Sequence, residues 1–257
     1  MQNQFTTKNQ SVDKAFSIIE YMSSMRMPLK LLEIAKGTGF PASTVSRLLT
    51  SLTDRGYVYQ NKETLKYSLT LKFCRIGDSA KSGLNIAEVV HPYLIDISNK
   101  LGETAYFAIE QDMMLVYMDA VGGSNISNAG IQRIGKIAPL HCAGIGKLML
   151  LNYDYKKLKK FIETKGLERF TPNTLCTEED LRDELNKVKK EGYAVDDQEC
   201  DEGIRCVAVP VRDYTGGIAG GLSVSGPADR ITPESYDDYL NVLFPVSKKI
   251  SERLGFE

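Results

Sequence analysis

A short stretch of the chain, "PASTVSRLLTSLTDRGYV" at residues 41–58, has hydroxyl groups and one arginine where a helix would face solvent. Its apolar residues recur at the spacing of a helix that buries one side. Short hydroxyl side chains and a guanidinium can reach base edges and phosphates in a DNA groove, whereas a glutamate-rich face would be repelled there. We expect these residues to contact DNA: Ser43, Thr44, Ser46, Arg47 and Thr50.

The residues before and within this stretch have the spacing of a helix-turn-helix. Ala35 is a small residue that lets two helices cross closely, and Gly39, four positions later, suits a turn with positive φ. Val45 and Leu48 would then hold the second helix against the first. A serine- and threonine-rich helix in some other small bundle is the alternative interpretation.

Two further helices are expected before this one. Ser11 is placed to cap the first of them, and its inward residues are expected to be Val12, Ala15, Phe16, Ile19 and Met22. Pro28 suits the first turn of the second helix, whose inward residues are expected to be Leu31, Leu32 and Ala35.

A β-hairpin and a short helix are expected to complete the first domain. Residues 56–70 alternate in polarity, with a turn near Asn61–Thr64, so Lys62 and Lys66 would lie on or beside the tip of a DNA-binding wing. Ordinary surface lysines are the alternative. A short amphipathic helix carrying Leu71, Cys74 and Ile76 then leads to a linker at Gly83.

Composition and charge limit the class of protein. The chain has 257 residues, 42% hydrophobic and 25% charged, which suits two globular domains. Residues 1–80 hold 11 Lys/Arg and 6 Asp/Glu, whereas residues 81–257 hold 21 Lys/Arg and 27 Asp/Glu. Only the first part therefore has the positive charge that binding to a polyanion favours. We expect no membrane span or signal peptide, and five scattered cysteines favour free thiols in a reducing cytoplasm.

The chain after position 83 has a mixed pattern of helices and strands. Strands in hairpins with helices between them predict an α+β domain built on an antiparallel sheet. Helices are expected at 86–101, 144–151, 155–166 and 178–191, with a last one from Thr232-Pro233-Glu234 to Gly255. Strands are expected at 104–110, 113–120, 193–199, 204–213 and 216–226, and loop with a short strand at 121–141.

Two segments, "APLHCAGIGKLML" and "DDQECDEGIRCVAVPVRDYTGGIAGGLSVSGP", together with the winged-helix pattern, resemble the isocitrate-lyase-regulator (IclR) family of bacterial transcription factors. The resemblance runs from about residue 10 to 254. It implies a winged helix-turn-helix domain with a linker helix over residues 1–83 and a GAF-like effector-binding domain over 84–257. It also implies homodimers or dimers of dimers, and operator binding under the control of an effector, here expected to be a small keto or hydroxy acid acting on a repressor.

The family's effector pocket matches Gly144, Ile145, Asp196, Cys206, Ser223 and Ser225 in this sequence. Free N–H groups at the start of a helix suit a carboxylate, and residues 223 and 225 face the same side of a strand. Asp196 would accept a hydrogen bond from a ligand hydroxyl or repel a second carboxylate. These residues also have structural alternatives. Gly144 would only start a helix, Asp196 would form a turn at a strand end, and Cys206 would be a small core residue. Ser223 and Ser225 would be ordinary inward strand residues.

Enzymatic chemistry has little support, so we expect no catalytic residue, metal or cofactor. His141 and Cys142 would point to opposite faces of a strand, and His91 has no evident partner. A zinc site from His141, Cys142 and Cys206 lacks ligand spacing. The alternatives are a GAF-type redox enzyme with Cys142 and Cys206 as its thiols, which leaves the basic winged helix unexplained, and an architectural DNA binder, which leaves the pocket unexplained.

Overall fold

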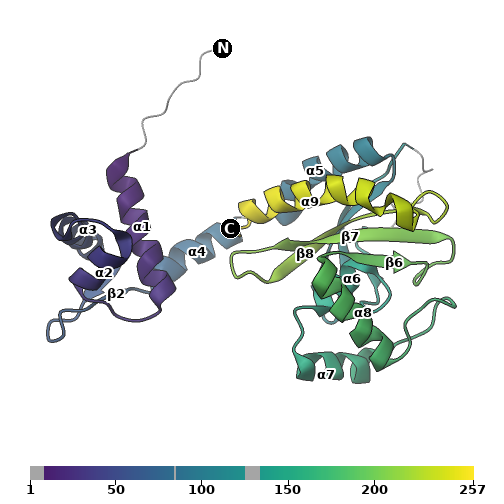
Figure 1. Ribbon diagram of the computed structural model, residues 1–257, viewed down its shortest axis with the longest axis horizontal. Helices are drawn as coiled ribbons and strands as arrows, with labels where there is room; N and C mark the ends of the chain where they lie inside the picture. Colours follow the sequence, from purple (N-terminus) through teal and green to yellow (C-terminus); the bar gives the residue numbers. More distant parts are fainter. Residues whose placement is uncertain (1–8, 84, 125–133) are drawn as a thin grey trace, which may run out of the picture. The chain divides into compact units, whose positions relative to one another are not determined.

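The computed structural model describes residues 9–83, 85–124 and 134–257. These residues fall into two compact units that divide at Leu84 (Figure 1). The expected loop and short strand over 121–141 therefore lies partly outside the described residues. No described helix combines the length and apolarity that crossing a lipid bilayer requires.

The first unit is a winged helix-turn-helix. Its elements are α1 (Gln10–Met25), α2 (Leu31–Thr38), α3 (Ala42–Asp54), the hairpin strands β1 (Val58–Gln60) and β2 (Tyr67–Leu69), and α4 (Lys72–Ser82). Gly39 ends α2 at φ 72°, as the turn between the two helices requires. Val45 and Leu48 face the small core that α1, α2 and the hairpin share with α3.

Several expectations for α1 are wrong in detail. Asn9, rather than Ser11, caps the helix by accepting hydrogen bonds from the Ser11 and Val12 N–H groups. The side chain at the centre of the core is Ile18, whereas Val12 and Phe16 are 48% and 57% exposed. The helical period fits two overlapping apolar stripes here, and the single chain buries only one of them.

The second helix begins three residues later than Pro28 suggests. Residue 29 first pairs with Tyr67 of the hairpin as an isolated β-bridge, which prevents a helical turn there. Lys30 then precedes α2, and Ile34 is its buried residue while Leu32 is 71% exposed. Leu32 was therefore wrongly expected to face inward.

The hairpin turn is where alternation places it, because the Asn61 side chain accepts hydrogen bonds from the N–H groups of Glu63 and Thr64. The α4 helix also forms, but its expected apolar face is exposed: Leu71 is 84% exposed and Ile76 47%, and Cys74 is exposed as well.

The second unit is a six-stranded antiparallel sheet within residues 85–124 and 134–257, in the order β5-β4-β3-β8-β7-β6. The strands are β3 (Thr104–Gln111), β4 (Met114–Val121), β5 (Ile137–Ala138), β6 (Ala194–Asp197), β7 (Ile204–Arg212) and β8 (Ile218–Pro227). The helices are α5 (Ile86–Leu101), α6 (Gly144–Leu150), α7 (Tyr155–Lys165), α8 (Glu178–Glu191) and α9 (Tyr236–Arg253). The predicted α+β class with an antiparallel sheet is confirmed.

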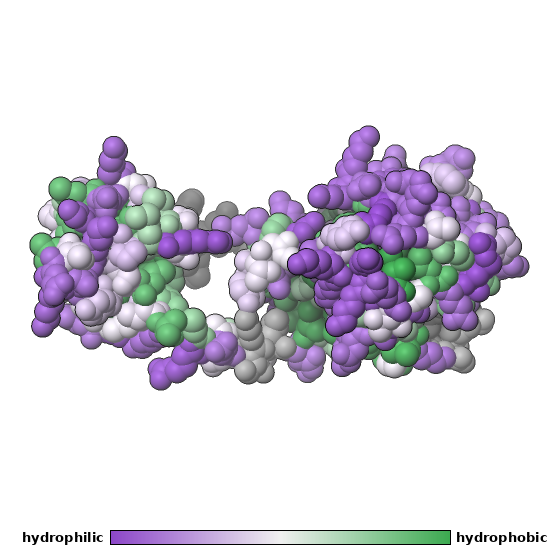
Figure 2. Space-filling model, turned by 90° about the horizontal axis from the view of Figure 1, so that it is seen from below, coloured by the Kyte–Doolittle hydropathy of each residue, from purple (hydrophilic) through white to green (hydrophobic). Residues whose placement is uncertain are grey.

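Helices cover both faces of the sheet. The α5 and α9 helices pack over one face, and α6, α7 and α8 lie on the other (Figure 1). Alternate residues therefore enter two separate cores: on β8, Leu222 and Val224 face α5 and α9, whereas Ser223 faces the α6 side. The face seen in Figure 2 is mostly hydrophilic, with apolar areas between the polar ones.

Local capping explains where most helices of this unit begin and end. Asn85 and Thr177 cap α5 and α8 through their side chains, and Gly102 and Gly192 end them in the left-handed region. The last helix differs from expectation, because Thr232 caps a short 3₁₀ turn, Pro233–Ser235, before α9 begins. His141 and Cys142 lie in a turn before α6 and not on a strand.

Candidate functional site

The residues expected to touch DNA share the outer face of α3. Ser43, Ser46, Arg47 and Thr50 are exposed and Thr44 is half-buried, while Val45, Leu48 and Leu49 on the opposite side are buried. The Thr50 hydroxyl donates to the Ser46 carbonyl at 3.0 Å, which leaves its oxygen able to accept. Lys62 is exposed at the hairpin tip and Lys66 is half-buried beside it. That these groups contact DNA stays a prediction.

Four of the six expected effector residues lie in two neighbouring rows of the sheet. Asp196 on β6 pairs with Cys206 on β7, which in turn pairs with Ser225 on β8. In the next row Ser223 pairs with Ala208 and with Tyr106 of β3. Directly paired residues project from the same face, so these side chains converge on the side covered by α6.

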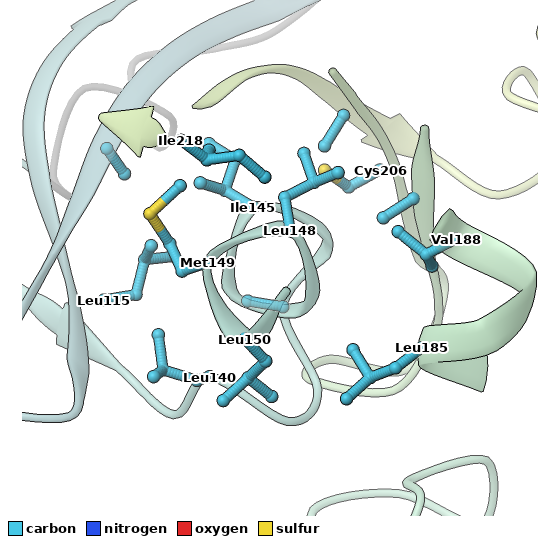
Figure 3. Close-up of a cluster of buried hydrophobic side chains, with 14 of the residues drawn as sticks. Leu115, Leu140, Ile145, Leu148, Met149, Leu150, Leu185, Val188, Cys206 and Ile218 are labelled. Carbon is cyan, nitrogen blue, oxygen red and sulfur yellow. The ribbon is translucent and has the colours of Figure 1, made fainter. Parts of the chain in front are cut away.

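Gly144 and Ile145, the other two, come from α6, which lies on this face (Figure 3). A Cβ at Gly144 would lie 3.2 Å from the Ala208 Cβ and 3.4 Å from the Cys206 Sγ, so the absence of a side chain lets the helix start close to the sheet. Gly221 likewise leaves room for Ile145, because a Cβ added at Gly221 would lie only 2.6 Å from the Ile145 Cγ2.

The structure brings all six expected residues together around one small cavity of about 20 Å³. Its wall also contains residues that the sequence did not single out: Tyr106, Leu115, Tyr117, Ala143, Asp201 and Ile204. A second cavity of about 240 Å³ shares Tyr117 and Asp201 with the first. Its remaining lining is Lys136, Ile137, Ala138, Pro139, Cys142, Phe170 and Cys200.

The α6 helix carries a buried lysine that the sequence pattern does not predict. Lys147 is fully buried, and its Nζ lies 2.6 Å from Glu199 Oε1 and 3.0 Å from Glu184 Oε1. Burial alone would lower the pKa of Lys147, but the two carboxylates outweigh burial and the pKa is raised. The ion pairs join α6 to α8 and to the turn that follows β6. A lysine within "GIGKLML" gives no sign in sequence that it is buried.

Asp196 supplies a buried carboxyl group to the wall of the small cavity. It is 7% exposed, and its Oδ1 accepts hydrogen bonds from the N–H of Glu199 at 2.7 Å and of Cys200 at 3.4 Å. Burial raises the pKa of Asp196 to about 6, although these hydrogen bonds and Lys147 favour the ionised form. The cavity can therefore present either a carboxylic acid or a carboxylate near neutral pH.

Asp196→Asn is expected to stabilise the protein at neutral pH, because the folded state disfavours an ionised Asp196. The unfolded pKa is near 4 and the folded pKa about 6, so wild-type stability falls relative to the variant as pH rises from about 4 to about 6. The difference in free energy of unfolding between the variant and wild type should reach about 2–3 kcal/mol above pH 7. Melting temperatures of both proteins at pH 4.5 and 7.5 would reveal it. Asp183→Asn, at an exposed position on α8, is the control; an Asp196→Asn gap that does not depend on pH would contradict the argument.

The histidines and cysteines do not form the enzyme sites considered from the sequence. Cys142 Sγ lies 2.9 Å from Cys200 Sγ, so its neighbour is Cys200 and not Cys206. The His141 Nε2–H group donates to the Glu168 carbonyl at 3.0 Å, and burial lowers the pKa of His141. The described residues contain no cluster of three or more His, Cys, Asp or Glu able to hold a metal ion.

His91 has a partner, contrary to expectation. Its Nδ1, on α5, lies 2.8 Å from Oδ2 of Asp119 on β4.

Comparison with known proteins matches the two units to two parts of one family. Residues 11–62 match the IclR helix-turn-helix domain, and residues 79–252 match the family described as bacterial transcriptional regulator IclR C-terminal. The chain is 32% identical to the HTH-type transcriptional regulator KdgR of Escherichia coli (strain K12), over 96% of this chain and 93% of that one. It is 28% identical to the transcriptional repressor IclR of the same organism, over 97% and 92%. The crystal structure of the Thermotoga maritima IclR, 31% identical, aligns over 97% of this chain and all of that one with a TM-score of 0.63.

Proposed function

This chain belongs to the IclR family of bacterial transcriptional regulators, and we propose that it is a repressor controlled by a small organic acid bound in its C-terminal domain. Its relatives are regulators and not enzymes, so the thiol-enzyme alternative falls. One observation carries the effector proposal: six residues from α6, β6, β7 and β8 converge on a single polar cavity.

The chemistry of this cavity suits a keto or hydroxy acid. The Ser223 and Ser225 hydroxyls, with the N–H groups of Gly144 and Ile145, would donate to a carboxylate. Asp196, with its pKa raised by burial to about 6, would donate to a ligand oxygen when protonated and accept from a ligand hydroxyl when ionised.

Ligand binding must open this cavity. About 20 Å³ holds a single water molecule and no organic acid. Two segments would have to separate from each other or from β8: residues 142–146, before and within α6, and residues 196–201, at the end of β6 and after it. We propose that this movement is the signal, and that the adjoining cavity of about 240 Å³ is the route of entry.

In the N-terminal unit, α3 is proposed to enter the major groove of operator DNA with Ser43, Thr44, Ser46, Arg47 and Thr50, while Lys62 and Lys66 contact the backbone. A homodimer or dimer of dimers would place two such helices in successive major grooves, about 34 Å apart. Uncovered apolar side chains on α1, and on and just before α4, are proposed to be covered by the second copy; they are Val12, Phe16, Leu71 and Ile76. Effector binding would change how the copies pair, and the whole process is proposed to take place in the cytoplasm.

The experiment that tests this proposal is a thermal-shift screen of the full chain against keto, hydroxy and dicarboxylic acids of central metabolism. An acid at 100 times its Kd should stabilise the protein by about 2.7 kcal/mol and raise Tm by several degrees. No shift with any acid at millimolar concentration would contradict the proposed ligand class.

Replacing Ser223 and Asp196 together with alanine is expected to abolish this response, because the cavity then loses a hydroxyl donor and its buried carboxyl group. Tm shifts and operator Kd are measured with the acids that stabilise wild type. Operator binding without acid should stay within about twofold of wild type, since neither residue lies in the N-terminal unit. Asp183→Ala is the control, and a double variant that still responds normally would show that the pocket is elsewhere.

A further inference from the structure

Two cysteines far apart in the sequence meet beside the small cavity. Cys142 and Cys200 are 58 positions apart, and their sulfur atoms lie 2.9 Å from each other. A disulfide bond is about 2.05 Å long, so the sulfurs need to approach by less than about 1 Å. Cys206, the third thiol of this region, lines the small cavity instead.

The thiol pair can be reached by a small reagent. Cys142 is fully buried, but Cys200 is partly exposed, and both sulfur-bearing residues line the cavity of about 240 Å³. A cavity of about 240 Å³ has room for hydrogen peroxide, which is little larger than a water molecule.

We propose that Cys142 and Cys200 are a reversible oxidation site, converted to an intramolecular disulfide by hydroperoxides. The Cys200 sulfur attacks the peroxide, so that an S–O bond forms, the O–O bond breaks, and water or an alcohol leaves. Cys142 then attacks the Cys200 sulfur, the S–S bond forms, and the oxygen leaves as water. Two thiols lose two electrons and two protons in total, and the peroxide takes them up. A dithiol reductant reverses the change.

The disulfide would join two segments that form the wall of the small cavity. Cys142 is directly followed by Ala143 and Gly144, and the Cys200 N–H donates to Asp196. The Lys147–Glu199 ion pair already joins α6 to the turn that holds Cys200, at 2.6 Å. A covalent link would prevent these two segments from separating from each other, so oxidation would hinder the opening that an acid needs. This last step alone rests on the proposed function.

Oxidation should be slow at neutral pH. The hydrogen bond that the Cys200 thiol donates to Cys142, together with burial and the Asp196 carboxylate, raises the pKa of Cys200 well above the ordinary thiol value. Because the thiolate is the reactive form, we expect reaction over minutes to hours at pH 7 and about a tenfold faster rate for each unit of higher pH.

The test uses the reduced full-length protein with hydrogen peroxide, followed by alkylation of free thiols, proteolysis and mass spectrometry. The expected product is a peptide pair linked through Cys142 and Cys200, with Cys74, Cys176 and Cys206 alkylated. Hydrogen exchange of the amides in residues 143–146 and 196–200 should slow severalfold on oxidation, because the link restrains both segments. Dithiothreitol should restore the original exchange rates.

Cys142→Ser and Cys200→Ser should each prevent the linked product, whereas Cys176→Ser, at a half-buried thiol outside the pair, should leave it intact. Linkage of Cys142 to Cys206, or oxidation of Cys200 to a sulfinic acid without any linked peptide, would overturn the proposal. Peptide mapping of the wild-type protein decides this even if a variant fails to fold. None of these readouts needs an effector or an operator, so a failed acid screen and a failed disulfide are distinguishable.

Discussion

Lys147→Met is expected to destabilise the C-terminal domain by about 3–5 kcal/mol, the usual cost of leaving one member of a buried ion pair alone. Lys147 is fully buried, and its Nζ is bound to Glu199, which is only 6% exposed. Methionine keeps nearly the same volume, so the loss comes from the charge. A fall in Tm of roughly 10 °C at pH 7.5 is the expected measurement.

The stability lost by Lys147→Met should depend on pH. Burial raises the pKa of Glu199 even with Lys147 beside it, and removing the cation raises it further. Below the raised pKa the variant holds a neutral carboxyl group, so its deficit is smaller at pH 5 and grows as pH rises through neutrality.

Restoring charge balance provides the control for this prediction. Lys147→Met combined with Glu199→Gln should recover most of the lost stability, whereas Lys147→Met combined with Asp183→Asn should not. A loss that is the same at pH 5 and pH 8, or no rescue by Glu199→Gln, would show that Lys147 acts by packing alone.

Arg47→Ala is expected to weaken operator binding by about 1–3 kcal/mol, a factor of roughly 5 to 150 in Kd. Arg47 is exposed on α3, one turn from the start of a face made mainly of hydroxyl residues. If Arg47 makes a bidentate contact to guanine, its loss should relax specificity at one base pair. If it contacts a phosphate, its loss should weaken binding to all sequences alike and reduce the salt dependence of log K by about one.

The measurement is fluorescence anisotropy at several salt concentrations, on a duplex that the wild-type protein selects from a random pool. Arg253→Ala, which removes the same charge from α9, should leave Kd within about twofold. An unchanged Kd for Arg47→Ala at fixed salt, with Tm also unchanged, would remove Arg47 from the interface.

Patterns that act over a few residues were readable from the sequence. Gly39 marks the left-handed turn before α3, and residues 61–64 mark the hairpin turn, because positive φ and side-chain hydrogen bonds to the backbone are satisfied locally. Alternation along β8 placed Ser223 and Ser225 on one face, and the cavity contains both. Bringing Gly144 and Asp196 to the same cavity needed the family resemblance, since nothing local relates α6 to β6.

Features that depend on long-range packing were missed. Lys147 and its partners Glu184 and Glu199 come from three separate elements, and the Cys142–Cys200 contact joins two turns. The spacing of apolar residues likewise could not tell the buried Ile18 from the exposed Phe16, because both fit a helical stripe and burial depends on what packs against it.

Operator affinity measured with and without an acid from the thermal-shift screen is the most direct test of an acid-controlled repressor. Titrating wild-type protein onto its selected duplex should give a Kd at least tenfold weaker when the stabilising acid is saturating, and the Ser223→Ala/Asp196→Ala variant should show no such change. If none of the acids that stabilise the protein changes the operator Kd, the protein is not an acid-controlled repressor.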